Sequence, residues 1–281
     1  MPALYRSLPL PPDLFSPSFD YSIVDGLGRA RQRGVDPQID GAVFRASTIG
    51  PVIELCNLRV GESLAHLRSA DWFDEAALSA LLDGISSDGG RWLERGGSRG
   101  LLKGEAIEDD SQINSFKIDA HKAALTLGFG KAAPLIVAAM GELIGNVTDH
   151  SEAKQTGIAV FSISRGTFEF VVADKGIGAL ASLTTNTAHS RLQDEGAALS
   201  AMVETGISRF NAGTGHGYGF RPIFERLADM TGELRFRSGD YALTLDGRFG
   251  DRISRRIVQK PEVRGLFAAV TCHVPDGSER S

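Results

Sequence analysis

Apolar residues recur at helical spacing in the middle of the chain. Four of them lie at intervals of four, three and four residues: Ile136, Met140, Leu143 and Val147. Such a stripe is typical of a helix that packs one face on a core. It predicts a helix over residues 131–150, where Pro134 is tolerated because it lies in the first turn. A preceding helix is predicted over residues 113–127, ending at a glycine turn.

The segments after this helix have the patterns of strands and turns. Residues 157–164 and 167–173 are mostly apolar and flank Arg165-Gly166, which predicts a hairpin. A second hairpin is predicted at 233–237 and 241–245, around Gly239-Asp240, and a last strand at 266–274. Residues 197–210 and 220–230 have helical patterns. The simplest arrangement that buries the apolar faces of these elements is a set of helices on one face of a mixed sheet.

The first third of the chain has a weaker pattern. Short apolar runs at 42–44 and 51–55 predict strands, and residues 71–82 predict a helix. Residues 8–17 are rich in proline and predict a surface arm. Glycine and serine clusters at 84–90 and 96–100 predict a boundary region. We therefore expect a smaller N-terminal α/β region at 1–109, either a partner-sensing domain or an elaboration of the domain at 110–281.

Composition limits the classes of protein to consider. The 281 residues are 42% hydrophobic and 23% charged, an ordinary globular mixture. A formal net charge of −5 gives no general basic surface and so disfavours sequence-independent nucleic-acid binding. Cys56 and Cys272 lie far apart, which fits a reducing compartment. Because no stretch approaches the roughly 20 apolar residues of a membrane span, we expect a soluble, cytoplasmic protein without a membrane partner.

Two polar residues share a face of the predicted helix at 131–150. Glu142 and Asn146 are four residues apart and lie beside the apolar stripe. An amide oxygen from Asn146 suffices as a protein ligand for a magnesium ion that is shared with phosphates. Glu142, one turn back, could then act as a general base. Taken alone, the pair is more typical of an ordinary surface Glu and Asn.

An acidic residue follows the predicted strand at 167–173. Asp174 precedes two glycines, Gly176 and Gly178, and a carboxylate there could accept a hydrogen bond from an exocyclic amine such as that of adenine. A site built for that bond rejects bases that lack the donor. The glycines would let the backbone approach a ring closely. The alternative is a simple turn, since Asp-x-Gly is common in loops.

A glycine-rich segment precedes the predicted helix at 220–230. Glycine occupies every second position: Gly213, Gly215, Gly217 and Gly219. Such a backbone can direct successive N–H groups at one anion, and the following helix adds its positive end. The segment is neither a phosphate loop of the Gly-Lys-Ser/Thr type nor a Rossmann fingerprint. His216 within it either touches phosphate or faces solvent, and a flexible loop is the alternative for the whole segment.

The three motifs, in this order and in a helix–hairpin–loop–helix context, resemble the GHKL ATPase superfamily. That superfamily includes gyrase B, the heat-shock 90 chaperones, histidine kinases and the mismatch-repair MutL proteins. The resemblance covers roughly residues 118–274. Residues 120–151 are most similar to the anti-sigma-factor serine-kinase branch, through the Gly128-Phe129 turn, the spacing to Glu142-Leu143, and His150-Ser151. The implied fold is a two-layer α/β sandwich, the Bergerat ATP-binding fold.

The resemblance also implies roles for individual residues. Glu142 corresponds to the general base, Asn146 to the magnesium ligand and Asp174 to the adenine-binding aspartate. The implied nucleotide contacts of the two glycine boxes are Gly176, Gly178, Gly213, Gly215, Gly217 and Gly219. Residues 179–212 would form an ATP lid. Two departures are Lys175, whose ammonium would reach phosphate or solvent, and Gly265-Leu266, where the superfamily usually has Gly-Thr.

The sequence therefore predicts a protein that binds ATP and Mg²⁺. It would hydrolyse ATP or transfer the γ-phosphate to a protein, as a regulatory switch. ATP or ADP is the expected small-molecule partner, a protein is the expected partner or substrate, and a homodimer is compatible with the pattern. One alternative is a non-catalytic, ATP-gated binding module whose lid controls a protein–protein interface. Another is a plain α/β protein in which the motifs are accidental.

Overall fold

The centre of the structure is a six-stranded sheet in which neighbouring strands are antiparallel. The computed structural model describes residues 18–35, 44–46, 48–57, 67–69, 75–86, 90–164, 166–205, 231–248 and 253–274. The strand order is β4-β5-β6-β7-β9-β8. The bounds are β4 (Gly90–Leu93), β5 (Arg99–Lys103), β6 (Ile158–Ser164), β7 (Thr167–Ala173), β8 (Glu233–Asp246) and β9 (Ser254–His273).

The protein is therefore an α/β protein, as predicted, but the predicted mixed sheet is wrong. Consecutive strands joined by short connections run antiparallel, and β4–β5, β6–β7 and β8–β9 are all such pairs. The hairpin predicted around Gly166 is confirmed as β6 and β7.

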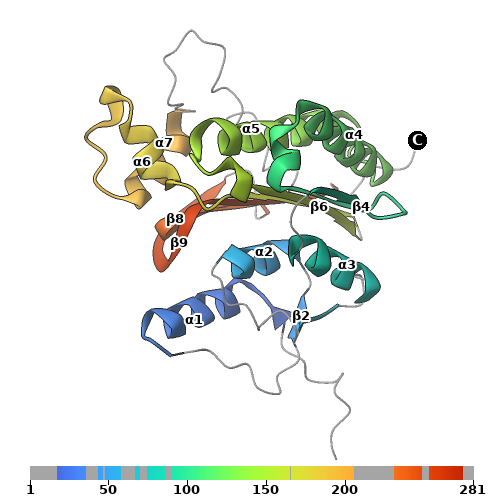
Figure 1. The fold of residues 1–281 in the computed structure, drawn as a ribbon, viewed down its shortest axis with the longest axis horizontal. Coiled ribbons are helices and arrows are strands. Elements are labelled where there is room, and N and C mark those ends of the chain that lie inside the picture. Colours follow the sequence, from blue (N-terminus) through green and yellow to red (C-terminus); the bar gives the residue numbers. More distant parts are fainter. Residues whose placement is uncertain are drawn as a thin grey trace, which may run out of the picture.

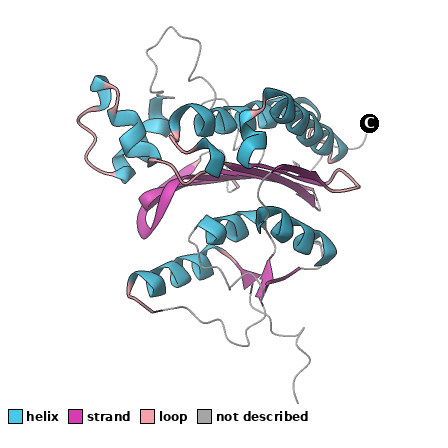
Figure 2. Ribbon diagram, in the orientation of Figure 1, coloured by secondary structure: helices cyan, strands magenta, loops and turns pink. Residues whose placement is uncertain are grey.

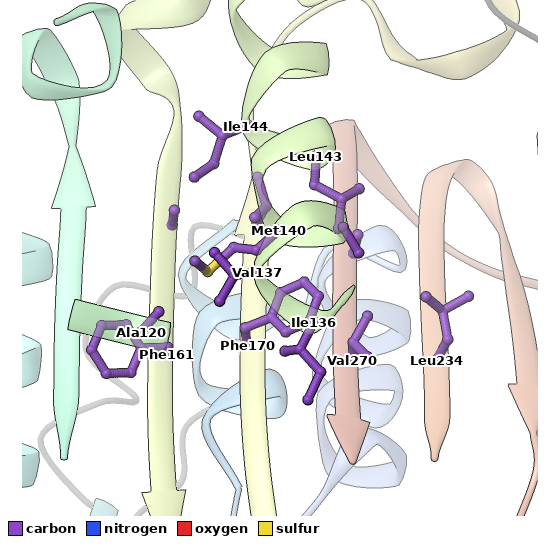
Figure 3. Packing of buried hydrophobic residues seen from close by; sticks show 14 of the residues in the cluster. Ala120, Ile136, Val137, Met140, Leu143, Ile144, Phe161, Phe170, Leu234 and Val270 are labelled. Atoms are coloured by element: carbon purple, nitrogen blue, oxygen red, sulfur yellow. The ribbon is translucent and has the colours of Figure 1, made fainter. Parts of the chain in front are cut away.

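Four helices cover one face of this sheet among the described residues, and we call them the helical layer (Figure 1). They are α4 (Asp110–Thr126), α5 (Ala133–His150), α6 (Gly178–Thr184) and α7 (Glu195–Thr205). The predicted apolar stripe of α5 is buried against the sheet. In Figure 3, Ile136 and Met140 of α5 lie over Phe170 and Val270 of the strands. Pro134 lies in the first turn of α5, and the Asp109 carboxylate caps α4 by accepting N–H bonds.

The other face of the sheet is covered as well, by what we call the N-terminal layer. Its helices are α1 (Tyr21–Gln32), α2 (Ile49–Asn57) and α3 (Glu75–Ser86). Behind them lies a parallel sheet in the order β1 (Ser18–Phe19), β2 (Phe44–Ala46) and β3 (Leu67–Ser69). Figure 2 shows the resulting succession of helices, sheet, helices and small sheet. The described helices of residues 110–281 therefore lie on one face of the central sheet, and helices of the predicted N-terminal region cover the other face.

The strands carry apolar residues on both faces, which explains why two layers of helices are needed. Phe168, Phe170 and Val172 of β7 belong to the core under the helical layer. Val171 and Ala173, at the alternate positions, belong to the core under the N-terminal layer. Because successive side chains of a strand point to opposite faces, β7 is buried on both sides.

Two predicted elements differ in the structure. Residues 51–55, predicted as a strand, lie within α2, where every residue except Cys56 is buried. A short run that is apolar on all sides does not distinguish a strand from a buried helix. The predicted hairpin around Gly239-Asp240 is one continuous strand, β8, which pairs with β9 along its length. Gly239 has φ +50° and lies at a shift in register, so the glycine marks a β-bulge and not a turn.

The boundary at residue 109 stays a prediction. Strands β4 and β5 precede it in the sequence, yet they belong to the central sheet, where β4 pairs with β5 and β5 pairs with β6. Short 3₁₀ turns flank the helices at Gly104–Glu108, Gly130–Ala132, Lys154–Thr156 and Thr187–His189. Within the described part of the chain, none of the helices has the length and apolar character that crossing a bilayer requires. The predicted arm at 8–17 and helix at 220–230 lie outside the described residues.

Candidate functional site

The two polar residues of the first motif lie on α5, next to its buried stripe. Leu143 and Val147 are buried between α5 and the sheet, and each is 1% exposed. Glu142 is exposed, and Asn146 is half-buried. The predicted placement of this pair, one turn apart and beside the stripe, is thus what the helix shows.

The end of α5 is held against the turn that follows β7. The backbone oxygen of Ser151 accepts a hydrogen bond from the N–H of Ile177 at 3.0 Å. A Cβ at Gly176 would lie 2.0 Å from that same oxygen, so no larger residue fits without movement of the backbone. The Ser151 hydroxyl donates to the Val147 carbonyl at 2.6 Å. The first and second motifs are therefore adjacent in space through Ser151.

Asp174 is a buried carboxylate at the end of β7, with 3% of the residue exposed. Its Oδ1 accepts hydrogen bonds from the N–H groups of Gly176, at 2.7 Å, and Leu266, at 3.4 Å. Its Oδ2 makes no hydrogen bond to any residue that the structure describes. Burial raises the pKa of Asp174 from 3.8 to about 6, although the two N–H bonds act in the opposite direction. Near neutral pH the group is thus mainly an anionic acceptor.

The chain then enters α6 through Gly178, which has φ +81°. The first N–H groups of α6 find side-chain partners from distant segments. Ser238 Oγ accepts the N–H of Ala179 at 2.8 Å, and Glu195 Oε2 accepts that of Leu180 at 3.0 Å. Burial raises the pKa of Glu195, and the nearby Ser238 hydroxyl is the main opposing influence. These two side chains fix the start of the segment predicted as a lid.

Gly265 closes the other side of the Asp174 turn. It has φ +78°, and a Cβ there would lie 2.3 Å from the Asp174 backbone oxygen. The Ser238 hydroxyl donates to the Gly265 oxygen at 3.2 Å. A glycine inside a strand signals such a close approach of backbones. Sequence reasoning missed Ser238 and Glu195, because they come from distant positions and carry no local motif, and it gave no role to Ser151, although the resemblance included His150-Ser151.

The remaining predicted site residues fall into two groups. Lys175 donates its backbone N–H to Thr156 Oγ1 at 2.9 Å, and its side chain lines a cavity on the side of the N-terminal layer. The second glycine box lies outside the described residues: Gly213, Gly215, His216, Gly217 and Gly219. Of the predicted lid at 179–212, the structure describes residues up to 205, which include α6 and α7.

Comparisons with known proteins leave the family open. No protein-family model matches the chain, and no curated protein matches it. Over the described ranges, no group of three or more His, Cys, Asp and Glu side chains is arranged to hold a metal ion. A magnesium ion bound by one amide oxygen, phosphates and water does not need such a group.

Proposed function

We propose that this protein binds ATP with Mg²⁺ at the corner between α5 and the turn after β7. It would be an ATPase or protein serine kinase of the GHKL type, built on a Bergerat fold. The observation that carries the proposal is Asp174, a buried carboxylate with one oxygen left without a partner among the described residues. The amine of an adenine ring would donate a hydrogen bond to this second oxygen, and hydrogen bonds to charged groups contribute about 1.5–3 kcal/mol.

The corner supports adenine recognition in a second way. Backbone contacts at Gly176 and Gly265 hold the Asp174 turn so closely that a Cβ at either glycine would collide with backbone atoms. A carboxylate that is fixed in this way needs little reorganisation to accept a hydrogen bond from a ligand. It would discriminate against a purine that carries no donor at that position.

The residues of α5 would act on the phosphate end of the nucleotide. Asn146 would contribute one amide oxygen to Mg²⁺, whose other ligands are phosphates and water. Glu142 would accept the proton of the attacking water or serine hydroxyl. The glycine box at 213–219 would contact phosphates through its backbone N–H groups. ATP, when bound, supplies the phosphoryl group. A cytoplasmic location and a protein partner or substrate belong to the same proposal.

One observation favours a second function, a non-catalytic module gated by ATP. The Glu142 side chain is exposed, and no hydrogen bond to a described residue holds it in place. A general base is usually oriented by a neighbour. In this second function the nucleotide would order the lid and switch a protein interface, with little turnover.

Calorimetry with Mg²⁺-ATP and Mg²⁺-ADP tests the nucleotide site. Asp174→Asn keeps the shape of the side chain but replaces one acceptor oxygen with a donor, so affinity should fall by about tenfold or more. Asp110→Asn, at an exposed position in the first turn of α4, is the matched control and should bind normally. Equal affinity of wild type and a folded Asp174→Asn variant would remove Asp174 from the site.

Incubation with γ-labelled ATP separates the two functions. Label released as phosphate indicates an ATPase, and label in a protein band indicates a kinase. Glu142→Ala should bind ATP normally but lose about 10²–10⁴-fold in turnover. Binding without any release or transfer of label in the wild type would support the gated module.

A further inference from the structure

A cavity of about 310 Å³ lies between the N-terminal layer and the central sheet. Its wall combines α2 and α3 with the end of β5, the start of β6 and Lys175. Ile158, which lines it, belongs to the core on the N-terminal side of the sheet. The cavity is therefore on the face opposite to α5. A volume of this size is within the range of small-molecule sites.

Two positive charges meet in this wall. Lys103 and Lys175 both line the cavity, and both ammonium groups lower the pKa of Cys56, another lining residue. Burial has the larger effect and raises that pKa to about 12, so the thiol stays neutral. Lys103 Nζ donates to the Ile85 carbonyl at 2.5 Å, which fixes one of the charges. No other described residue of the wall carries a charge.

An unpaired donor belongs to the same wall. Asn57, at the end of α2, is 9% exposed, and its Nδ2 has no hydrogen-bond partner among the described residues. Buried donors of this kind are normally paired, and leaving one unpaired costs about 1–3 kcal/mol. A ligand oxygen in the cavity would provide the missing acceptor.

The rest of the wall is partly apolar. Ile53 of α2, Ile85 of α3 and Ile158 of β6 contribute branched aliphatic side chains. At about 30 Å³ for each water-sized group, the cavity holds about ten such groups. A ligand that fits would thus be small, with an anionic end for the lysines and a body that contacts the isoleucines.

We propose that this cavity binds a small organic anion, with its carboxylate or phosphate group between Lys103, Lys175 and Asn57. The apolar part of the ligand packs on the three isoleucines. The backbone N–H of Lys175 is bound to Thr156, another residue of the wall, and Lys175 directly follows Asp174. The ligand thus contacts both the N-terminal layer and the turn that carries Asp174. Binding of the anion itself does not rest on the proposed nucleotide site.

Fluorine NMR titration of the full chain tests this site with three probes of similar shape. They are 4-fluorobenzoate, 4-fluorophenyl phosphate and the uncharged 4-fluorobenzyl alcohol. At least one anion should bind saturably, and the alcohol should bind about tenfold more weakly or not at all, because it gains no charged hydrogen bond. The comparison of the two anions identifies the preferred head group. No saturable binding of either anion at millimolar concentration would overturn the proposal, as would equal binding of the alcohol.

Two lysine variants locate the bound anion. Lys175→Gln removes a charge from the wall and should weaken anion binding about tenfold. Lys154→Gln is the matched control, because Lys154 is half exposed, pairs with Glu108 at 2.6 Å and does not line the cavity. Thermal unfolding confirms that both variants are folded. Equal weakening in both variants, or none in Lys175→Gln, would contradict the assignment. Addition of Mg²⁺-ADP should leave the anion bound, and its displacement by ADP would place the anion in the nucleotide site instead.

Discussion

The two faces of the central sheet are both buried, but different interactions hold their helices. Under the helical layer the core is apolar and rich in phenylalanine. Phe161 and Phe168 stack with ring centroids 6.2 Å apart, and Phe116 lies 5.3 Å from Phe161. Under the N-terminal layer, apolar residues share the interface with buried ions. The comparison therefore distinguishes helices positioned by apolar packing from helices that are also positioned by buried ion pairs.

The ions on the N-terminal side form one connected cluster. Arg235 of β8 binds both carboxylate oxygens of Glu54 on α2, at 2.8 and 3.0 Å. Arg237, two residues on, is 0% exposed and also contacts Glu54. Asp25 of α1 pairs with Arg235 at 3.2 Å and contacts Lys260 of β9. These charges tie two helices to two strands, in a geometry that apolar contacts would not specify.

A further carboxylate holds the start of α2. Glu169 of β7 accepts hydrogen bonds from the N–H groups of Ile49 and Gly50, both at 2.8 Å. A side chain from a neighbouring strand therefore accepts N–H groups in the first turn of α2. The positive end of the helix dipole lies at this turn. The helical layer has no equivalent contact from the sheet to the start of α5 among the described residues. We infer that polar contacts and apolar packing together set the position of α2, whereas that of α5 is set mainly by packing.

The largest expected effect comes from breaking the ion cluster. Glu54→Ala leaves Arg235 and Arg237 buried without their shared partner, and should lower the free energy of unfolding by about 3–5 kcal/mol. Arg248→Ala is the control, because Arg248 is 40% exposed and its pairs with Glu233 and Asp246 lie at the surface. That change should cost about 0–1 kcal/mol. Urea unfolding measures both, and similar values for the two variants would mean that the buried cluster contributes no more than a surface pair.

A cavity made in the apolar face should have a slightly smaller effect. Met140 of α5 is 0% exposed, and Met140→Ala should cost about 2–5 kcal/mol through lost burial and the space left behind. Unlike Glu54→Ala, it leaves no charge unpaired, so Met140→Leu should recover most of the stability. Urea unfolding of the three proteins is the measurement. Failure of Leu to recover stability would show that this face also needs a specific shape.

The two faces should also differ in their response to pH. Burial raises the pKa of Glu169 from 4.5 to about 7, although the Ile49 and Gly50 N–H bonds lower it. Between pH 4.5 and about pH 7, Glu169 keeps its proton in the folded protein but releases it in the unfolded chain. The stability contributed by protonated Glu169 is therefore complete below about pH 4.5 and is lost as pH rises through about 7. The difference of 7 − 4.5 = 2.5 in pKa corresponds to about 3 kcal/mol.

Unfolding curves of wild type and Glu169→Gln across this range measure that contribution. The amide does not titrate, so the stability of the variant should fall less between pH 4.5 and 8. Met140→Ala, on the apolar face, should keep the full wild-type slope. Parallel curves for wild type and Glu169→Gln would show that Glu169 does not titrate in this window.

The sequence predicted the helical layer better than the N-terminal layer, for a physical reason. The helix α5 has a periodic apolar stripe, and the hairpin β6–β7 has two apolar runs around a glycine turn, so both patterns depend only on neighbouring residues. In β8, Arg235 and Arg237 alternate with Leu234 and Phe236, a pattern typical of a strand with one face in water. This face is buried because Asp25 of α1 and Glu54 of α2 pair with the arginines, and both acids are distant in the sequence. The helix α2 itself was mispredicted because it is apolar on nearly all sides.

The candidate site shows the same division between local and distant information. The position of Asp174 and its glycines directly after β7 could be predicted, since a strand pattern ends before them. The contacts that shape the turn come from Ser151, Ser238 and Gly265, up to 91 residues away in the case of Gly265. No spacing rule connects such positions. The second glycine box and His216 lie outside the described residues, so their part in the site stays a prediction.

The smallest expected effects come from two glycines on either side of the contact between α5 and the Asp174 turn. Gly176→Ala would place a Cβ 2.0 Å from the Ser151 oxygen, and the resulting shift should cost about 1–3 kcal/mol. Gly145→Ala, in the interior of α5, meets nothing within 4 Å and should stabilise the helix by about 0.5–1 kcal/mol. Because Gly176 lies between Asp174 and α6, its replacement should also weaken ATP binding. Urea unfolding and calorimetry with Mg²⁺-ATP on both variants are the measurements. A Gly176→Ala protein with unchanged stability and unchanged affinity would show that the close contact between α5 and this turn is not needed for either property.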